Sequence, residues 1–200
     1  MSMASPALQA EPQTEVQTAG FDDGLAPDCD GQNDGRAVTL EQYLHTVYSP
    51  DCDYVDGELQ ERNVGELDHA EVETALAMWF RSHDKEWNIR AVVDLRIQVA
   101  ATRFRIADVY LISRSVPVEQ VPPHPLLAVI EVLSPEDRVS RYQERLDDYR
   151  RMGVRNIWIV DPLHRRGYDC STGSWIESMS FAVENSPIAV DLSAIFADLS

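Results

Sequence analysis

The segment that decides the fold of this chain runs from Leu126 to Leu133 and reads LLAVIEVL. A short, nearly continuous apolar run of this kind predicts a strand that is buried on both faces of a sheet. Glu131 interrupts the run with a carboxylate. An ionised carboxylate removed from water costs several kcal/mol unless it is paired, hydrogen-bonded or bound to a cation. Glu131 therefore needs a partner from elsewhere in the chain.

A second acid stands in a second apolar segment. Asp108 lies within residues 104–112, which read FRIADVYLI and also predict a buried strand. Two acids in two buried strands predict a functional site. The alternative for each acid is a structural role, in which backbone amides or arginines satisfy the carboxylate.

Length and composition predict one folded domain. A chain of 200 residues with 44% hydrophobic content can form one core. Residues 1–38 carry seven acids against Arg36 and show no helical or strand periodicity, which predicts a disordered acidic tail. The folded domain is expected to span residues 39–200. No apolar stretch is long enough for a secretory signal or a membrane span, so we expect a cytoplasmic protein without membrane contact.

The three cysteines predict free thiols. Cys29, Cys52 and Cys170 are odd in number and far apart, and no two of them form a C-x-x-C pair. This pattern argues against a disulfide framework or a zinc ribbon.

The charge of the chain argues against simple nonspecific binding to nucleic acid. The net charge is −17, and residues 39–200 alone still carry −11. Nonspecific duplex binding depends on a basic face that neutralises phosphates. Residues 138–166 nevertheless hold eight arginines against four acids, a local positive excess. These arginines can equally form a solvated helix face.

Several local signals precede the two acidic segments. Thr39 and Gln42 have the spacing of a capping box, which predicts the start of a short helix. Asp56-Gly57 stands between apolar residues and predicts a β-hairpin. Asp68 is expected to cap a second helix that extends to about Ser82.

Further signals surround and follow the two segments. Alternating apolar residues from Val93 to Val99 predict a strand before the Asp108 segment. Residues 134–137, which read SPED, predict a helix start, and Gly153 is expected to end that helix. Residues 156–160 predict another buried strand, and residues 164–182 a closing hairpin followed by a short helix near the end.

The expected order is helix, three strands, helix and strand. We therefore predict an α/β domain with an αβββαβ core and a mixed central sheet. The strand of Glu131 and the strand at residues 156–160 should be parallel, because a helix connects them as a right-handed crossover. A short helix and a hairpin precede this core, and a hairpin follows it.

This order resembles the PD-(D/E)XK nuclease superfamily, with an acid on the second core strand and a glutamate on the third. Five motifs narrow the resemblance to the Uma-two family of restriction-endonuclease-like proteins. They are Tyr54–Leu59 (YVDGEL), Ile106–Val109 (IADV), Val129–Pro135 (VIEVLSP), Glu144–Leu146 (ERL) and Gly153–Pro162 (GVRNIWIVDP). The resemblance extends from about residue 39 to residue 200.

The resemblance implies an endonuclease that hydrolyses DNA phosphodiester bonds with Mg²⁺, or with Mn²⁺ as an alternative ion. Asp108, Glu131 and the main-chain carbonyl of Val132 would hold the ion, since Mg²⁺ prefers oxygen ligands. Glu58 matches a family glutamate that would complete the metal shell; alternatively it is a solvent-facing strand acid. His69 matches a family histidine that would orient water or contact phosphate; alternatively it is structural or exposed.

One position departs from the superfamily pattern. Leu133 stands where the superfamily has a lysine, and Lys85 is the only lysine of the chain. In the family the lysine comes from the following helix, and Arg145 occupies the matching position. Arginine can hold a phosphate but cannot accept a proton from water. The alternative function is therefore a noncatalytic nuclease-fold module for binding or interaction. By analogy with two-strand cleavage, the active form would be a homodimer.

Overall fold

The structure, a computed structural model, describes residues 29, 37–62, 65–117, 119–134, 139–197 and 199. Nearly all of the predicted acidic tail lies outside these residues. Pro135, Glu136 and Asp137 of the predicted helix start also lie outside them.

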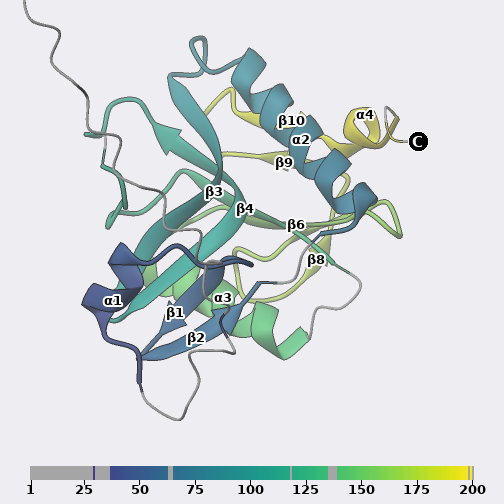
Figure 1. Ribbon diagram of the computed structural model, residues 1–200. Helices are drawn as coiled ribbons and strands as arrows, with labels where there is room; N and C mark the ends of the chain where they lie inside the picture. Colours follow the sequence, from purple (N-terminus) through teal and green to yellow (C-terminus); the bar gives the residue numbers. More distant parts are fainter. Residues whose placement is uncertain are drawn as a thin grey trace, which may run out of the picture.

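Eight strands form one mixed sheet (Figure 1). They are β1 (Cys52–Val55), β2 (Glu58–Glu61), β3 (Ile89–Ala100), β4 (Arg103–Ser113), β5 (Ala128–Val132), β6 (Ile157–Asp161), β7 (Arg166–Asp169) and β8 (Ile176–Glu177). The strand order is β2-β1-β4-β5-β6-β7-β8, and β3 pairs with β4. The pairing of β5 with β6 is parallel, as predicted, while β4 and β5 are antiparallel.

Helices cover both faces of this sheet. The helices are α1 (Leu40–His45), α2 (Leu67–Ser82), α3 (Val139–Met152) and α4 (Leu192–Ala197), and a small second sheet pairs β9 (Ser180–Ala182) with β10 (Ala189–Asp191). Figure 1 shows α2 and α4 on one side of the large sheet and α3 on the other, and each side has its own hydrophobic cluster. The predicted αβββαβ core is α2, β3, β4, β5, α3 and β6. Among the described residues, no helix combines the length and apolar content needed to cross a bilayer.

Three of the local signals behave as predicted. The Thr39 hydroxyl accepts the backbone N–H of Gln42 at 3.2 Å, and the Gln42 side chain accepts the backbone N–H of Thr39 at 2.9 Å, which completes the capping box. Asp56 and Gly57 both have positive φ, at 51° and 100°, as the tight hairpin turn between β1 and β2 requires. Gly153, with φ of 97°, follows the end of α3.

The start of α2 differs from the prediction. The helix begins at Leu67 with Glu66 as its N-cap, and the Glu66 side chain makes no capping hydrogen bond. Asp68 lies in the first turn instead, where its negative charge interacts favourably with the positive end of the helix dipole.

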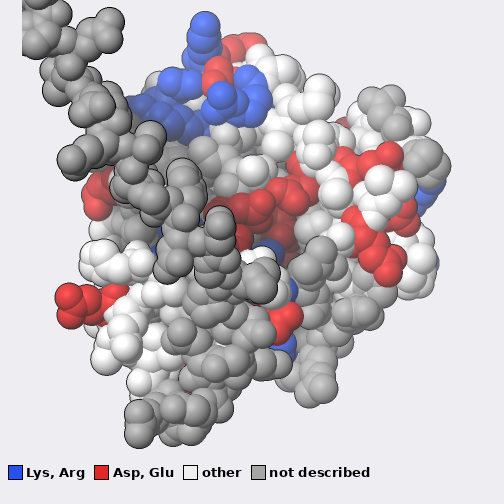
Figure 2. All heavy atoms as spheres, in the orientation of Figure 1, with Lys and Arg blue, Asp and Glu red and all other residues white. Residues whose placement is uncertain are grey.

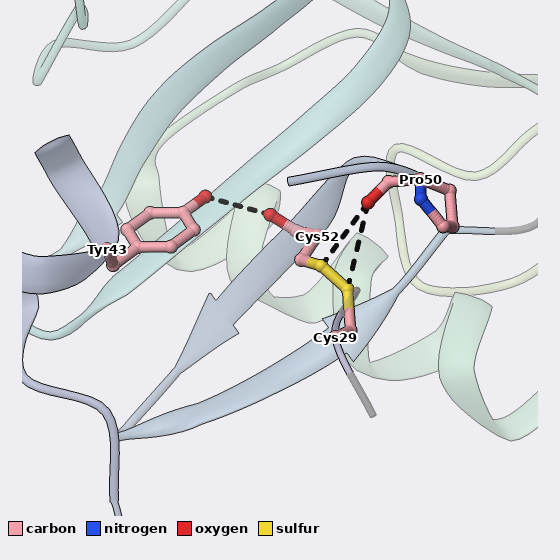
Figure 3. The surroundings of a disulfide bond; sticks show 4 residues. All are labelled: Cys29, Tyr43, Pro50 and Cys52. Atoms are coloured by element: carbon pink, nitrogen blue, oxygen red, sulfur yellow. Dashed lines mark hydrogen bonds between the residues drawn. A yellow bond between two sulfur atoms is a disulfide. The ribbon is translucent and has the colours of Figure 1, made fainter. Parts of the chain in front are cut away.

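The prediction of free thiols is wrong for two of the three cysteines. Cys29 and Cys52 form a disulfide with their Cα atoms 6.3 Å apart, within the usual range for such bonds. Figure 3 shows the bond beside Pro50, with the Tyr43 hydroxyl donating to the Cys52 carbonyl at 2.9 Å. The bond joins positions 23 residues apart, so no short sequence motif marks it. Cys170 is free and buried.

Candidate functional site

The site forms where β4 changes its partner strand. β1 pairs with the first two residues of β4, and β5 pairs with residues 109–111. Near this change of partner, two carboxylates accept backbone hydrogen bonds. Asp53 Oδ1 accepts the N–H of Ile106 at 2.9 Å, and Asp108 Oδ2 accepts the N–H of Val132 at 2.6 Å. Both acids therefore extend the hydrogen bonding of the sheet.

Asp108 is 1% exposed and faces two basic groups. The Arg62 guanidinium donates through Nη2 to Oδ1 of Asp108, and Nε2 of His69 lies 3.6 Å from Oδ2. Burial by itself would raise the pKa of Asp108, but Arg62, His69 and the Val132 amide outweigh burial and lower this pKa to about 2. Asp108 is therefore an anion at neutral pH.

Glu131 is fully buried and is held at both oxygens. The Tyr149 hydroxyl donates to Oε1 at 2.6 Å, and Nη1 of Arg145 donates to Oε2 at 3.0 Å. Nη1 of Arg62 lies 3.9 Å from the same Oε2. Burial raises the pKa of Glu131 to about 7. Arg145 and Arg62 lower this pKa, and the charge of Asp108 raises it. The two acids singled out from the sequence thus meet around one guanidinium.

Asp53 is a third buried acid, which the sequence analysis did not single out. It is 0% exposed, and its Oδ2 lies 3.1 Å from Nη1 of Arg105 and 3.2 Å from Nη2 of Arg145. Burial would raise the pKa of Asp53, but Arg145, Arg105 and Arg62, together with the Ile106 amide, outweigh it and lower this pKa. No apolar run marks Asp53 in the sequence, since Asp51 and Asp56 flank its short strand.

Arg145 spans two of these acids. Its Nη1 and Nη2 contact Glu131 and Asp53 respectively, so α3 is tied to β5 and β1. Its Nε is buried without a hydrogen-bond partner among the described residues. The carboxylates raise the pKa of Arg145 further above its usual value although burial opposes them. Arg145 is thus permanently charged beside Glu131.

More acids surround Asp108 on the side of α2. Burial raises the pKa of Glu73 to about 7, and the charges of Asp94 and Asp108 add to that effect. Burial also raises the pKa of Asp94, with Asp108 again contributing. His69 lies between Asp108 and Glu73, with its Nδ1 3.9 Å from Oε2 of Glu73. Figure 2 shows acidic side chains gathered at the centre of the face it displays.

Glu58 lies apart from these acids. It is exposed at the start of β2, paired with Val55 across the hairpin turn, and Val55 pairs in turn with Arg103 on β4. Asp108 is five residues further along β4, so at about 3.3 Å per residue it lies roughly 16 Å from Arg103, and Glu58 is at the Arg103 end and two strands away from β4. The structure therefore does not bring Glu58 to the other predicted metal ligands.

One comparison decides which family this arrangement belongs to. Residues 40–170 match the family model Uma2, described as "Putative restriction endonuclease". The chain belongs to the Uma2 family. The matched range contains the hairpin, both acids of the central strands and the arginine of α3. No curated protein matches the chain.

One solved structure shares its fold with this Uma2 chain. The crystal structure of a putative nuclease belonging to DUF820 from Anabaena variabilis is 15% identical to this chain, with a TM-score of 0.68. The match covers 80% of this chain and 98% of that one. It shows a shared restriction-endonuclease-like fold. A cryo-EM structure of the DrdV–DNA complex also matches, at 15% identity over 64% of this chain and 10% of that one, but its TM-score of 0.37 is too low to support an argument.

A pocket of about 250 Å³ opens beside the acids of this Uma2 chain. It lies at the carboxyl ends of the parallel strands β5 and β6, where ligands of α/β proteins commonly bind. Its walls are Glu66, Asp68, His69, Leu133, Ser134, Asp161, Pro162, Leu163 and His164. His69 and Ser134 also line a cavity of about 20 Å³ that Arg62 and Arg145 face. The pocket therefore adjoins the groups that hold Asp108 and Glu131.

Proposed function

We propose that the chain is a Mg²⁺-dependent endonuclease that hydrolyses phosphodiester bonds of DNA. The observation that carries this proposal is the convergence of Asp108 and Glu131 on one positive group. Arg62 bonds to Oδ1 of Asp108 and lies 3.9 Å from Oε2 of Glu131. Two carboxylates that share one cation in this way are placed to share a metal ion. Membership of the Uma2 family supports the reaction class.

The donor atoms at this point suit a hard dication. Mg²⁺ prefers oxygen ligands and retains several waters, so two carboxylates and one carbonyl are sufficient protein ligands. Asp108, Glu131 and the carbonyl of Val132 would supply them. The Val132 carbonyl accepts a hydrogen bond from the Tyr142 hydroxyl at 3.1 Å but has a second lone pair. Within the described ranges no three Asp, Glu, His or Cys side chains form a ready ion site, so water would complete the shell. Mn²⁺ would serve as an alternative ion.

The residues around the acids have separate roles in this proposal. A bound Mg²⁺ would supply a coordinated water of lowered pKa and offset the charge on the phosphate. Tyr149 and Arg145 hold the two oxygens of Glu131 in place. His69, beside Asp108 on the wall of the pocket, would orient a water or contact phosphate. Arg145 cannot accept a proton, so we assign it to electrostatic stabilisation of the phosphate.

The charge distribution limits how DNA would approach. The chain carries −17, and on the face in Figure 2 basic side chains gather at the upper edge while acidic ones occupy the centre. A DNA backbone is attracted to basic groups and repelled by acidic ones. We therefore expect binding to depend on the divalent ion, which would offset part of the acidic charge. Cleavage of both strands would use two copies of the chain, each with one site.

A noncatalytic binding or interaction module is the second candidate. Two observations favour it. Arg62 and Arg145 neutralise Asp108 and Glu131 without a metal, and Leu133 stands where the superfamily has its lysine. In that case the acids serve the sheet and its ion pairs alone.

The test is calorimetric titration of the full chain with Mg²⁺ and Mn²⁺, followed by incubation with plasmid in the same buffers. Wild type is compared with Glu131→Gln and with Glu177→Gln, an exposed acid on β8 that pairs with Arg166. Metal binding and plasmid nicking that vanish in Glu131→Gln and persist in Glu177→Gln would support the nuclease. Metal binding without nicking in wild type would favour the second candidate. If wild type shows no metal binding and no nicking, the nuclease proposal is overturned.

A further inference from the structure

Arg62 occupies the place where the two central acids converge. It directly follows β2, and its guanidinium reaches Asp108 on β4 and approaches Glu131 on β5. The side chain is only 12% exposed. Sequence reasoning gave no signal for this contact, because Arg62 is an isolated basic residue after a hairpin. The structure brings it across 46 residues of sequence to Asp108.

The charge of Arg62 acts on five acids around the site. It contributes to the lowered pKa of Asp108 and Asp53, and it opposes the rise in the pKa of Glu131 that burial causes. It also lowers the pKa of Glu73 and Asp94, the two acids on the side of α2, although burial and neighbouring acids prevail there. One guanidinium thus offsets part of the charge of five carboxylates, which is the effect a bound cation would have.

The guanidinium of Arg62 is only partly hydrogen-bonded to the protein. Nη1 of Arg62 is buried without a hydrogen-bond partner among the described residues. Arg105 has more partners, since its guanidinium donates to Asp53, to Gln60 and to Asp148, although its Nη2 is likewise buried without a hydrogen-bond partner among the described residues. Arg62 has one close ion pair, with Asp108. Its withdrawal would break one short contact rather than a network.

We propose that Arg62 is a built-in counter-cation of the Asp108–Glu131 site, and that a divalent cation binds these acids only in exchange for its guanidinium. The inference rests on the proposed function only in taking these two acids as the metal ligands. The exchange follows from electrostatics: two like charges a few ångströms apart in a buried site repel each other strongly. Arg62 therefore lowers the affinity for metal and stabilises the metal-free protein.

The test replaces Arg62 with methionine, which keeps an unbranched apolar side chain in place of the arginine stem and removes the charged guanidinium. Arg114→Met is the control, because Arg114 has a similar ion pair with Asp84 away from the site. Mn²⁺ and Mg²⁺ affinities are measured by calorimetry on the full chain, and melting temperatures are measured with and without Mn²⁺. We expect Arg62→Met to bind Mn²⁺ at least tenfold more tightly than wild type and to melt lower without metal. Its gain in melting temperature on adding Mn²⁺ should also exceed that of wild type, and Arg114→Met should match wild type in affinity.

Two further variants keep the test decisive. In Arg62→Met/Glu131→Gln the gain in affinity should disappear, which assigns it to this site. If Arg62→Met does not fold, Arg62→Lys is measured instead, and its shorter reach toward Glu131 should tighten Mn²⁺ binding two- to fivefold. Equal or weaker Mn²⁺ binding in the folded Arg62 variant than in wild type would overturn the inference.

The outcome is independent of the outcome for the nuclease. Tighter metal binding in Arg62→Met without plasmid cleavage by either protein would support the counter-cation and overturn the enzyme. Metal-dependent cleavage by wild type, together with unchanged metal affinity in Arg62→Met, would support the enzyme and overturn the counter-cation.

Discussion

Nη1 of Arg145, on α3, lies 3.0 Å from Oε2 of Glu131, on β5. This contact joins the helix on one face of the sheet to the central parallel strand. Both side chains are largely removed from solvent, with 13% of Arg145 and none of Glu131 exposed. A buried ion pair has little net effect on stability compared with an apolar pair, but loss of one partner leaves a costly buried charge.

Replacement of Arg145 by methionine should therefore destabilise the protein by roughly 3–5 kcal/mol, the usual cost of breaking a buried ion pair. Asp53 would lose one of its two arginines at the same time. Urea unfolding at neutral pH measures the change. Arg166→Met is the matched control, because Arg166 pairs with Glu177 in solvent and such pairs contribute about 0–1 kcal/mol. Similar losses in both variants would contradict a buried charge network.

Glu73 should make stability depend on pH. Its pKa is raised to about 7 by burial, Asp94 and Asp108, so the folded protein binds the Glu73 proton more tightly than the unfolded chain does. The resulting stability is present below the unfolded pKa of about 4.5 and is lost as pH rises through about 7. Relative to Glu73→Gln, wild type should lose about 1 kcal/mol between pH 4.5 and 8, a value reduced for solvent screening. Urea unfolding of both proteins across this pH range measures how the difference between their free energies of unfolding changes with pH. A difference that stays constant with pH would contradict the prediction.

The disulfide between Cys29 and Cys52 should stabilise the protein by reducing the conformational entropy of the unfolded chain. For a loop of this size the expected gain is about 3 kcal/mol. Cys29→Ser should unfold at correspondingly lower urea, and dithiothreitol should lower the stability of wild type to the same level. Dithiothreitol should leave Cys29→Ser unchanged, which separates the disulfide from other effects of the reductant.

Cys170 should be inert in the native state. It is fully buried, and burial raises the pKa of its thiol to about 12, so almost no thiolate is present at neutral pH. Ellman titration of the unreduced protein should find almost no reactive thiol in buffer and one per chain in denaturant. After reduction in denaturant the count should be three. One fast-reacting thiol in native buffer would contradict the burial of Cys170.

The fold and half of the site follow from patterns along the chain. Apolar runs identified β4 and β5, and the acids within them marked Asp108 and Glu131, because a carboxylate in such a run needs a partner. The Asp56-Gly57 turn identified the first hairpin. Each of these signals lies within one element and needs no knowledge of how distant elements meet.

The remaining residues depend on contacts between elements far apart in sequence. Arg62 acts on Asp108 across 46 residues, and the disulfide joins positions 23 residues apart. Glu58 was singled out by its family motif, yet the register of the hairpin places it at the distant end of β1 and β2. Asp53 was missed because its strand is only four residues long and Asp51 and Asp56 flank it, so no apolar run marks it as one marks Asp108.

The hydrogen bonds from the amides of Ile106 and Val132 to Asp53 and Asp108 bear on how this protein can evolve. A protein of this fold without nuclease activity would still need both acids, since their loss would leave two buried amides without acceptors. Inheritance of the fold alone would therefore preserve much of the acidic motif. In such proteins we expect the first replacements at residues that are needed for catalysis but make no hydrogen bond to the sheet, such as a lysine beside the glutamate.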